Sequence, residues 1–99
     1  MNSDAPDAVV VSPEAQHDLD ALIDHVVLRN PHAAARLLAE IEEAMDLLAS
    51  RVVDGRMIAL HSGERYRRWF VHPVSIFYER AAGVVRVVRI YHHAREPLG

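Results

Sequence analysis

Apolar residues recur with a helical period along the N-terminal half of the chain. The first such stretch follows Ser12-Pro13-Glu14, where Ser12 can cap a helix, Pro13 suits its first position and Glu14 complements the helix dipole. Its apolar side chains form one stripe: Leu19, Leu22, Ile23, Val26 and Val27. This spacing predicts an amphipathic helix.

A second helix is predicted from about Pro31 to about Ser50. The residue before a proline is pushed out of the helical region, so Asn30-Pro31 ends the first helix and begins the second, with Asn30 as its cap. The apolar stripe consists of Ala34, Leu37, Leu38, Ile41, Met45 and Leu48. Two helices this close in sequence predict a tight helical hairpin.

The remaining apolar runs have the two-residue period of strands. Ala8 to Val11 is a β-branched run that predicts a strand before the helices. After Asp54-Gly55 the alternation predicts four more strands, at Arg56 to Leu60, Arg65 to His72, Val74 to Ala81 and Val84 to His92. Ala82-Gly83 predicts a tight hairpin turn between the last two. The element order is therefore strand, helix, helix and several antiparallel strands, an α+β arrangement.

Length and composition predict one soluble domain. The 99 residues leave no room for a separate cofactor domain, so we expect a single domain over residues 1–99 with a flexible tail at 1–7. Cysteine is absent, which excludes a disulfide framework and a thiolate metal site. No signal peptide or membrane-spanning run is apparent in the sequence, so a cytoplasmic location is expected.

Charge is segregated along the chain. Residues 1–50 hold two arginines and ten acids, whereas residues 51–99 hold nine arginines and four acids, giving net charges of −8 and +5. Every basic residue apart from histidine is arginine, whose planar guanidinium suits carboxylates and phosphates. We therefore expect a basic face that attracts an acidic partner. Three acids of the first helix should repel nucleic acid from the other side: Asp18, Asp20 and Asp24.

Short motifs occur along the chain in a fixed order: Ala15, Asp18 and Leu19, then Asn30-Pro31, Gly55, Tyr66-Arg67, Ile76-Phe77-Tyr78, and Val88-Arg89-Ile90-Tyr91-His92 with Arg95. Through these motifs nearly the whole chain, from Val9 to Glu96, resembles the ParE/RelE toxin superfamily of type II toxin–antitoxin systems. The resemblance implies a RelE/ParE-like fold, in which an N-terminal strand and a helical hairpin pack on a small antiparallel β-sheet.

The resemblance implies one of two activities. RelE-like members are ribosome-dependent mRNA endonucleases, whereas ParE-like members inhibit DNA gyrase. The nuclease branch often has an arginine where this chain has Ser75 or Ile76, and lysines where it has Arg67 and Arg68, which are poor proton carriers. We therefore favour a ParE-like gyrase inhibitor, neutralised by a cognate antitoxin in a hetero-oligomer and needing no cofactor. A toxin fold that has lost toxicity and only binds its partner is a third interpretation.

Two sets of candidate site residues follow. For a nuclease, the acid–base and phosphate-binding groups would be Arg67, Arg89, Tyr91, His92 and His93. For a binding protein, the partner contacts would be Arg67, Trp69, Arg89, His93 and Arg95. Trp69 has an alternative role in core packing. A metal site is not expected, because no carboxylate lies at ligand spacing from His92 and His93, and His72 is remote in sequence.

A regular last strand would divide its side chains between two faces. Alternation puts Val84, Val88 and Ile90 on the core-facing side, and Arg89, Tyr91 and His93 on the polar side. We also expect Arg89 and Arg95 to share an anion-binding patch near the end of the sheet, with Arg86 as a further surface cation.

Overall fold

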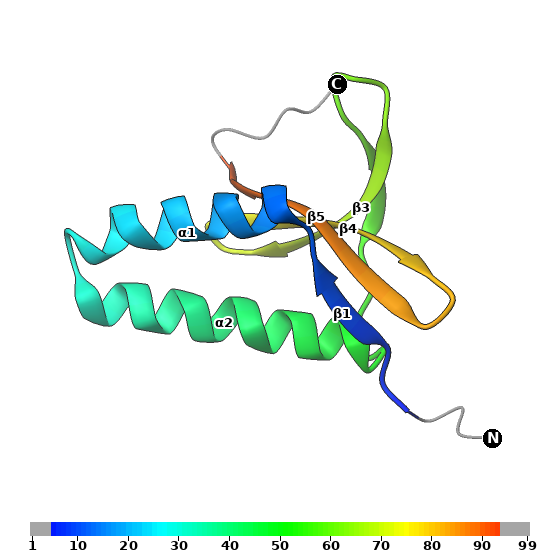
Figure 1. Ribbon diagram of the computed structural model, residues 1–99, viewed down its shortest axis with the longest axis horizontal. Coiled ribbons are helices and arrows are strands. Elements are labelled where there is room, and N and C mark those ends of the chain that lie inside the picture. Colours follow the sequence, from blue (N-terminus) through cyan, green and yellow to red (C-terminus); the bar gives the residue numbers. More distant parts are fainter. Residues whose placement is uncertain (1–4, 94–99) are drawn as a thin grey trace.

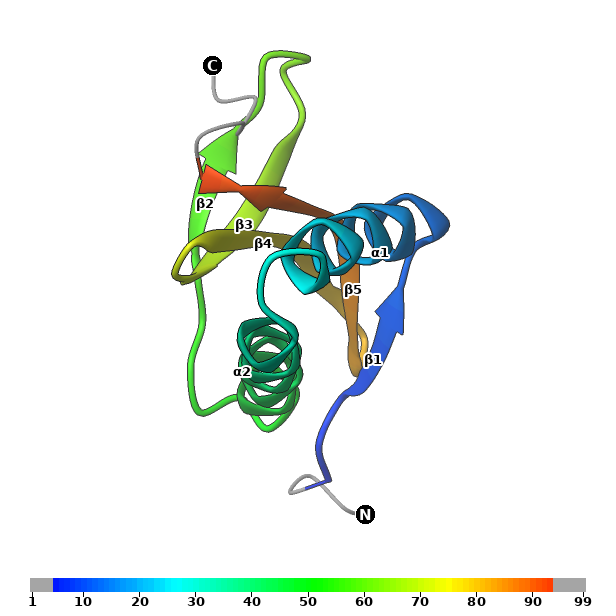
Figure 2. The same ribbon diagram turned by 90° about the vertical axis from the view of Figure 1, so that its left-hand side faces the viewer.

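A computed structural model describes residues 5–93 and contains two helices that run side by side and cover one face of a five-stranded sheet (Figures 1 and 2). The elements lie in the predicted order. The bounds expected for the five strands and for the second helix are met within one residue, whereas the first helix ends at Val27, before the Asn30-Pro31 break that was expected to end it. The elements are β1 (Ala8–Val11), α1 (Pro13–Val27), α2 (Pro31–Ala49), β2 (Arg56–Ala59), β3 (Arg65–Val71), β4 (Val74–Ala81) and β5 (Val84–His92).

The local signals in the sequence form the caps and the turn that they predict. The Ser12 hydroxyl accepts a hydrogen bond from the amide of Ala15 at 3.1 Å and caps α1. Asn30 caps α2 in the same way. Ala82 and Gly83 both have positive φ, at 43° and 79°, as the turn between β4 and β5 requires. Within residues 5–93, no helix is long and apolar enough to cross a membrane.

The sheet has the strand order β1-β5-β4-β3-β2 and is mixed rather than purely antiparallel. β2, β3, β4 and β5 are joined in antiparallel pairs, as expected. β1 lies at the edge and runs parallel to β5, with Ala8 opposite Val84 and Val11 opposite Val87. The α+β class is confirmed, and the expectation of an all-antiparallel sheet is corrected by this one parallel pair.

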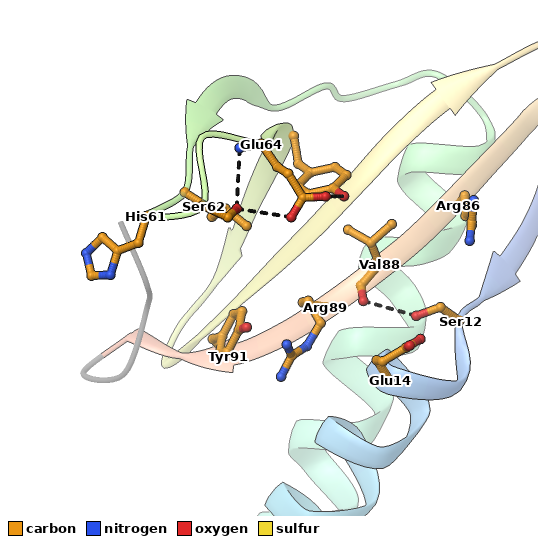
Figure 3. Close-up of a pocket in the computed structure, with 11 residues that line it drawn as sticks. Ser12, Glu14, His61, Ser62, Glu64, Arg86, Val88, Arg89 and Tyr91 are labelled. Atoms are coloured by element: carbon orange, nitrogen blue, oxygen red, sulfur yellow. Dashed lines mark hydrogen bonds between the residues drawn. The ribbon is translucent and has the colours of Figure 1, made fainter. Parts of the chain in front are cut away.

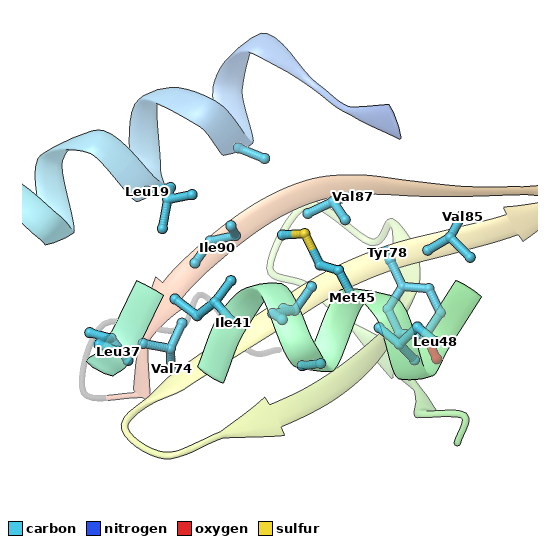
Figure 4. Close-up of a cluster of buried hydrophobic side chains, with 13 residues drawn as sticks. Leu19, Leu37, Ile41, Met45, Leu48, Val74, Tyr78, Val85, Val87 and Ile90 are labelled. Carbon is cyan, nitrogen blue, oxygen red and sulfur yellow. The ribbon is translucent and has the colours of Figure 1, made fainter. Parts of the chain in front are cut away.

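The core lies between the helical hairpin and the face of the sheet that β4 and β5 dominate. Figure 4 shows side chains from both helices pointing toward those of the two strands. The residues with no exposed surface in this cluster are Ala15, Ile41, Leu48, Val74, Ile76, Tyr78, Val85 and Val87. Burial of this apolar surface is what attaches the amphipathic helices to the sheet.

A β-bulge in β5 changes which of its side chains face the core. Phe77 pairs with Arg89 and Tyr78 pairs with Val87, so Val88 is an extra residue without a partner on β4. Val85 and Val87 are buried before the bulge and Ile90 after it, whereas Val84 and Val88 are only half-buried. The predicted core set of Val84, Val88 and Ile90 is therefore wrong at its first two members, because regular alternation does not hold across Val88.

The folded domain begins before β1. The carboxylate of Asp7 is 5% exposed and pairs with Arg51 at 2.7 Å and with Arg80 at 2.9 Å. The Asp7 amide also donates to the carbonyl of Ala49 at 2.8 Å. Asp7 thus ties the N-terminal segment to the end of α2 and to β4, so the expected tail at 1–7 is too long by at least this residue.

Candidate functional site: the open face of the sheet

The sheet face turned away from the helices carries most of the basic and aromatic candidates. We call it the open face. Four residues paired in register cross it from β2 to β5: Arg56, Arg68, Phe77 and Arg89. A neighbouring row consists of Phe70, Ser75 and Tyr91. Residues directly opposite one another share a face, so these rows bring three arginines and three aromatic rings together.

Two side chains of this face are completely covered by their neighbours. Ser75 and Phe77 are 0% exposed, and neither belongs to the core cluster beneath the helices. The Arg68 Nε donates to the Ser75 hydroxyl at 3.0 Å, and the Tyr91 ring meets the Phe77 ring edge-on at 5.6 Å. Ser75 is one of the two positions where a nuclease-type arginine was expected, and it serves here as the acceptor for a neighbouring strand's arginine.

Arg89 is paired within the chain. Asp18 of α1 accepts from its Nε at 2.7 Å and from a terminal nitrogen at 3.0 Å, and accepts a third bond from the Ile90 amide at 3.0 Å. The guanidinium also lies 4.6 Å above the ring of Tyr91. The hydrogen bond to Asp18 raises the pKa of Arg89. Burial raises the pKa of the Tyr91 hydroxyl.

This pair corrects the role expected for Asp18. The sequence placed it among solvated acids that repel nucleic acid, but its carboxylate is only 13% exposed and neutralises the central cation of the open face. Asp18 follows Ala15 by three residues and precedes Leu22 by four, so it lies on the inward stripe of α1. An acid on an apolar stripe is a signal that could have identified this pair.

A pocket of about 480 Å³ opens where the start of α1, β5 and the β2–β3 loop meet (Figure 3). It is chemically mixed. Arg86 and Arg89 line it together with Glu14 and Glu64, and Glu64 accepts hydrogen bonds from Ser62 and from Tyr66. The bond to Glu64 raises the pKa of Tyr66. Carboxylates on the rim make this pocket a poor phosphate site.

Arg67 lies on the other side of the sheet, in a polar cluster at the end of α2. It donates to the carbonyl of Gly55 at 2.8 Å and lies 3.5 Å from Asp54. The Tyr78 hydroxyl donates to Asp54 and accepts from the Gly55 amide at 2.6 Å. Burial raises the pKa of Tyr78, and its bond to Asp54 adds to that shift. Burial opposes the net shift of Asp54, but Tyr78, Arg67 and Arg80 together lower its pKa.

Gly55 is required here by a close backbone approach. A Cβ at this position would lie 2.2 Å from the carbonyl oxygen of Arg68, a distance that no side chain can occupy. The loop between α2 and β2 therefore passes directly against β3. This contact explains why a glycine stands at the motif position that the sequence singled out.

Trp69 packs toward the helices. It is partly buried against the core cluster and pairs with Ile76, whose side chain is fully buried. The core-packing interpretation of Trp69 therefore describes its position, and its ring does not share the open face with Arg89.

The histidines at the end of β5 join a cluster that the sequence did not predict. The His92 and His93 rings stack at 4.7 Å, and His93 also stacks on His72 at 5.8 Å. Phe70 meets His72 edge-on at 5.9 Å and His93 at 6.4 Å. Among residues 5–93, no group of three or more histidine, cysteine or acidic side chains is placed to hold a metal ion.

The structure thus divides the candidate residues among three places. Arg89 and Tyr91 lie together on the open face, and Arg67 lies on the helix side beside Asp54. His93 lies at the corner beside Phe70 and stacks on His92, which pairs with the buried Val74 and so lies on the helix side. Arg95 lies outside the described residues, so its shared patch with Arg89 stays a prediction. The residues that sequence reasoning missed are Asp18, Asp54, Phe70 and His72, all brought in by contacts between distant segments.

Comparison with known proteins gives consistent matches. A model of the family described as "ParE toxin of type II toxin-antitoxin system, parDE" matches residues 9–97. Toxin RelE1 of Caulobacter vibrioides is 34% identical over 84 residues, which cover 85% of this chain and 90% of that protein. A solved chain described as the chromosomal ParDE TA system from P. aeruginosa has a TM-score of 0.70 at 22% identity, covering 86% of this chain and 94% of its own. Since the family match spans most of the sequence, this chain belongs to the ParE toxin family of type II toxin–antitoxin systems.

Proposed function

We propose that this toxin inhibits DNA gyrase by binding it and that a cognate antitoxin neutralises it. The proposal is supported most by the separation of the residues that RNA cleavage would need. Cleavage requires a base, an acid and a phosphate-binding cation around one reacting group. Within residues 5–93, Arg67 lies on the opposite side of the sheet from Arg89 and Tyr91, and Asp18 already neutralises Arg89.

The open face is the proposed contact surface. Arg56 and Arg68 line it, and the partly exposed Arg89 lies in the same register row. Arg86, which lies 3.5 Å from Glu79, adds a further exposed cation on β5. Such a face complements acidic residues of a partner, and electrostatic complementarity accelerates association. The antitoxin would set acidic side chains against these arginines and complete a toxin–antitoxin hetero-oligomer. His93 at the corner, and Arg95 beyond the described residues, would extend the contact.

A supercoiling assay tests the proposal. Purified toxin is titrated into gyrase with relaxed plasmid, and we expect dose-dependent loss of supercoiling that added antitoxin restores. Arg56→Glu reverses one charge of the open face and should weaken inhibition at least about tenfold, the effect of about 1.4 kcal/mol. Arg36→Glu makes the same change on the exposed side of α2 and is the matched control. Unimpaired supercoiling at a large excess of folded toxin contradicts the proposal.

A second candidate function is ribosome-dependent mRNA cleavage. It is favoured by the adjacency of Arg89 and Tyr91 on the open face, where a cation stacks on a phenol. Mapping mRNA ends after induction distinguishes the two functions, because gyrase inhibition produces DNA damage and filamentous cells instead. In either case the toxin would act in the cytoplasm, where both targets are found.

A further inference from the structure

Four rings form a continuous cluster at one corner of the sheet: Phe70, His72, His92 and His93. We call it the aromatic ladder. Phe70 belongs to the open face, whereas His92 pairs with the buried Val74 and lies on the helix side, where it stacks on His93. His93 stacks on both other histidines, with centroid distances of 4.7 Å to His92 and 5.8 Å to His72. Phe70 contacts His72 and His93 edge-on. Phe70 and His92 lie at the ends of β3 and β5, and His72 and His93 directly follow these strands, which β4 separates in the sheet.

The ladder is exposed, and the backbone holds it in place. Phe70 keeps 45% of its surface accessible, and His72 and His93 are also exposed. The His93 amide donates to the carbonyl of Pro73 at 2.8 Å, and its ring Nδ1 lies 3.2 Å from the same oxygen. These contacts fix the end of β5 against the β3–β4 turn. The rings are therefore exposed and already ordered, so a ligand that binds them does not have to overcome the entropy cost of ordering flexible side chains.

Cations adjoin the rings. The Arg68 guanidinium lies 5.5 Å from the centre of the Phe70 ring and also bonds Ser75. Arg68 pairs in register with Arg56 on β2, so positive charge continues from the ladder toward that edge of the sheet. This is the combination by which proteins bind single strands: rings on which bases stack, beside a basic track that follows the phosphates.

We propose that the aromatic ladder binds the unpaired bases of a single-stranded nucleic acid. A base would extend the histidine stack on the exposed His72 side and lean against Phe70, while its phosphates lie toward Arg68 and Arg56. Duplex DNA does not fit this chemistry, because its bases are already stacked. An acidic peptide would satisfy the arginines but not the ring faces. The inference is independent of gyrase inhibition and requires no cleavage.

Fluorescence anisotropy tests the proposal with labelled oligothymidylate and oligouridylate of about 12 nucleotides. The folded full-length toxin should bind at low salt and weaken as salt rises from about 50 to about 200 mM. Phe70→Leu keeps an apolar side chain but removes the ring, and should weaken binding at least about fivefold, the lower limit for one stacked base. Phe70→Trp should retain affinity. His32→Ala removes an exposed imidazole of α2 that contributes no ring to the ladder and is the control.

The outcomes separate clearly. Binding of one strand or both, lost in Phe70→Leu and His72→Ala but kept in Phe70→Trp and His32→Ala, supports the ladder and identifies the preferred sugar. No binding of either strand overturns the proposal, and so does binding that Phe70→Leu leaves unchanged. If both loss variants instead lose affinity only for the antitoxin, the ladder is a protein contact and the proposal is wrong. Gyrase supercoiling measured on the same variants is a separate readout, since the anisotropy assay contains no gyrase.

Discussion

Replacing Asp18 by alanine should destabilise the whole domain, because its carboxylate joins α1 to β5. The change removes three hydrogen bonds, two from the Arg89 guanidinium and one from the Ile90 amide. Bonds to charged groups contribute about 1.5–3 kcal/mol each when fully buried. Arg89 is 39% exposed, so water replaces part of the lost pairing. We estimate about 1 kcal/mol for the guanidinium and about 1–2 kcal/mol for the unpaired amide, or about 2–3 kcal/mol together.

Urea denaturation measures this loss. The free energy of unfolding of a domain of this size falls by about 1 kcal/mol per M of urea, so the midpoint of unfolding should fall by about 2–3 M. Asp24→Ala removes an exposed acid from the same helix and should change the stability by less than about 0.5 kcal/mol. In a double-mutant cycle, Asp18 and Arg89 should couple by about 1 kcal/mol. An Asp18→Ala protein as stable as the Asp24→Ala control would refute the reasoning.

Three further predictions concern the helix side of the sheet. Gly55→Ala should cost about 3 kcal/mol or more in thermal unfolding, because the new Cβ meets the Arg68 carbonyl. The pKa of Asp54 is lower in the folded protein than its unfolded value of 3.8. At pH values above 3.8 the ionised carboxylate therefore stabilises the fold, and this stability is lost as the pH falls through the folded pKa. In Tyr78→Phe, which lacks the bond that lowers this pKa, the melting temperature should fall less steeply below about pH 4. Trp69, the single tryptophan, packs on the core, so its emission should move to longer wavelength on unfolding in urea, and an unshifted spectrum would count against its burial.

Local structure could be predicted from the sequence because its causes are local. The caps at Ser12 and Asn30 and the turn at Ala82-Gly83 each depend on a few adjacent residues. The helical and strand periods likewise require only neighbouring positions, and for this reason the bounds of the strands and of the second helix agree closely. The family resemblance supplied the packing of these elements.

The wrong predictions concern strand register and side-chain partners, which the periodicity of apolar residues does not specify. The alternation of β5 reverses at Val88 because β4 has one residue fewer across the bulge. The partner of Arg89 lies 71 residues away, and the rings beside His93 come from another strand. The chemistry of a residue can be inferred from its type, but its partners depend on how the strands and helices align. This alignment decides whether Arg89 is available to a target or is paired with Asp18 of α1.

The parallel pairing of β1 with β5 has a consequence for the order of events during synthesis. Ala8 emerges from the ribosome 76 residues before Val84, its partner. At roughly 5–20 residues per second, this interval lasts about 4–15 s. Throughout it, β1 lacks its partner strand β5, and Asp18 lacks its partner Arg89. The nascent toxin therefore cannot complete its fold until translation has passed β5. A partner that binds the helical hairpin earlier does so before β5 is available to cover the apolar face of the hairpin.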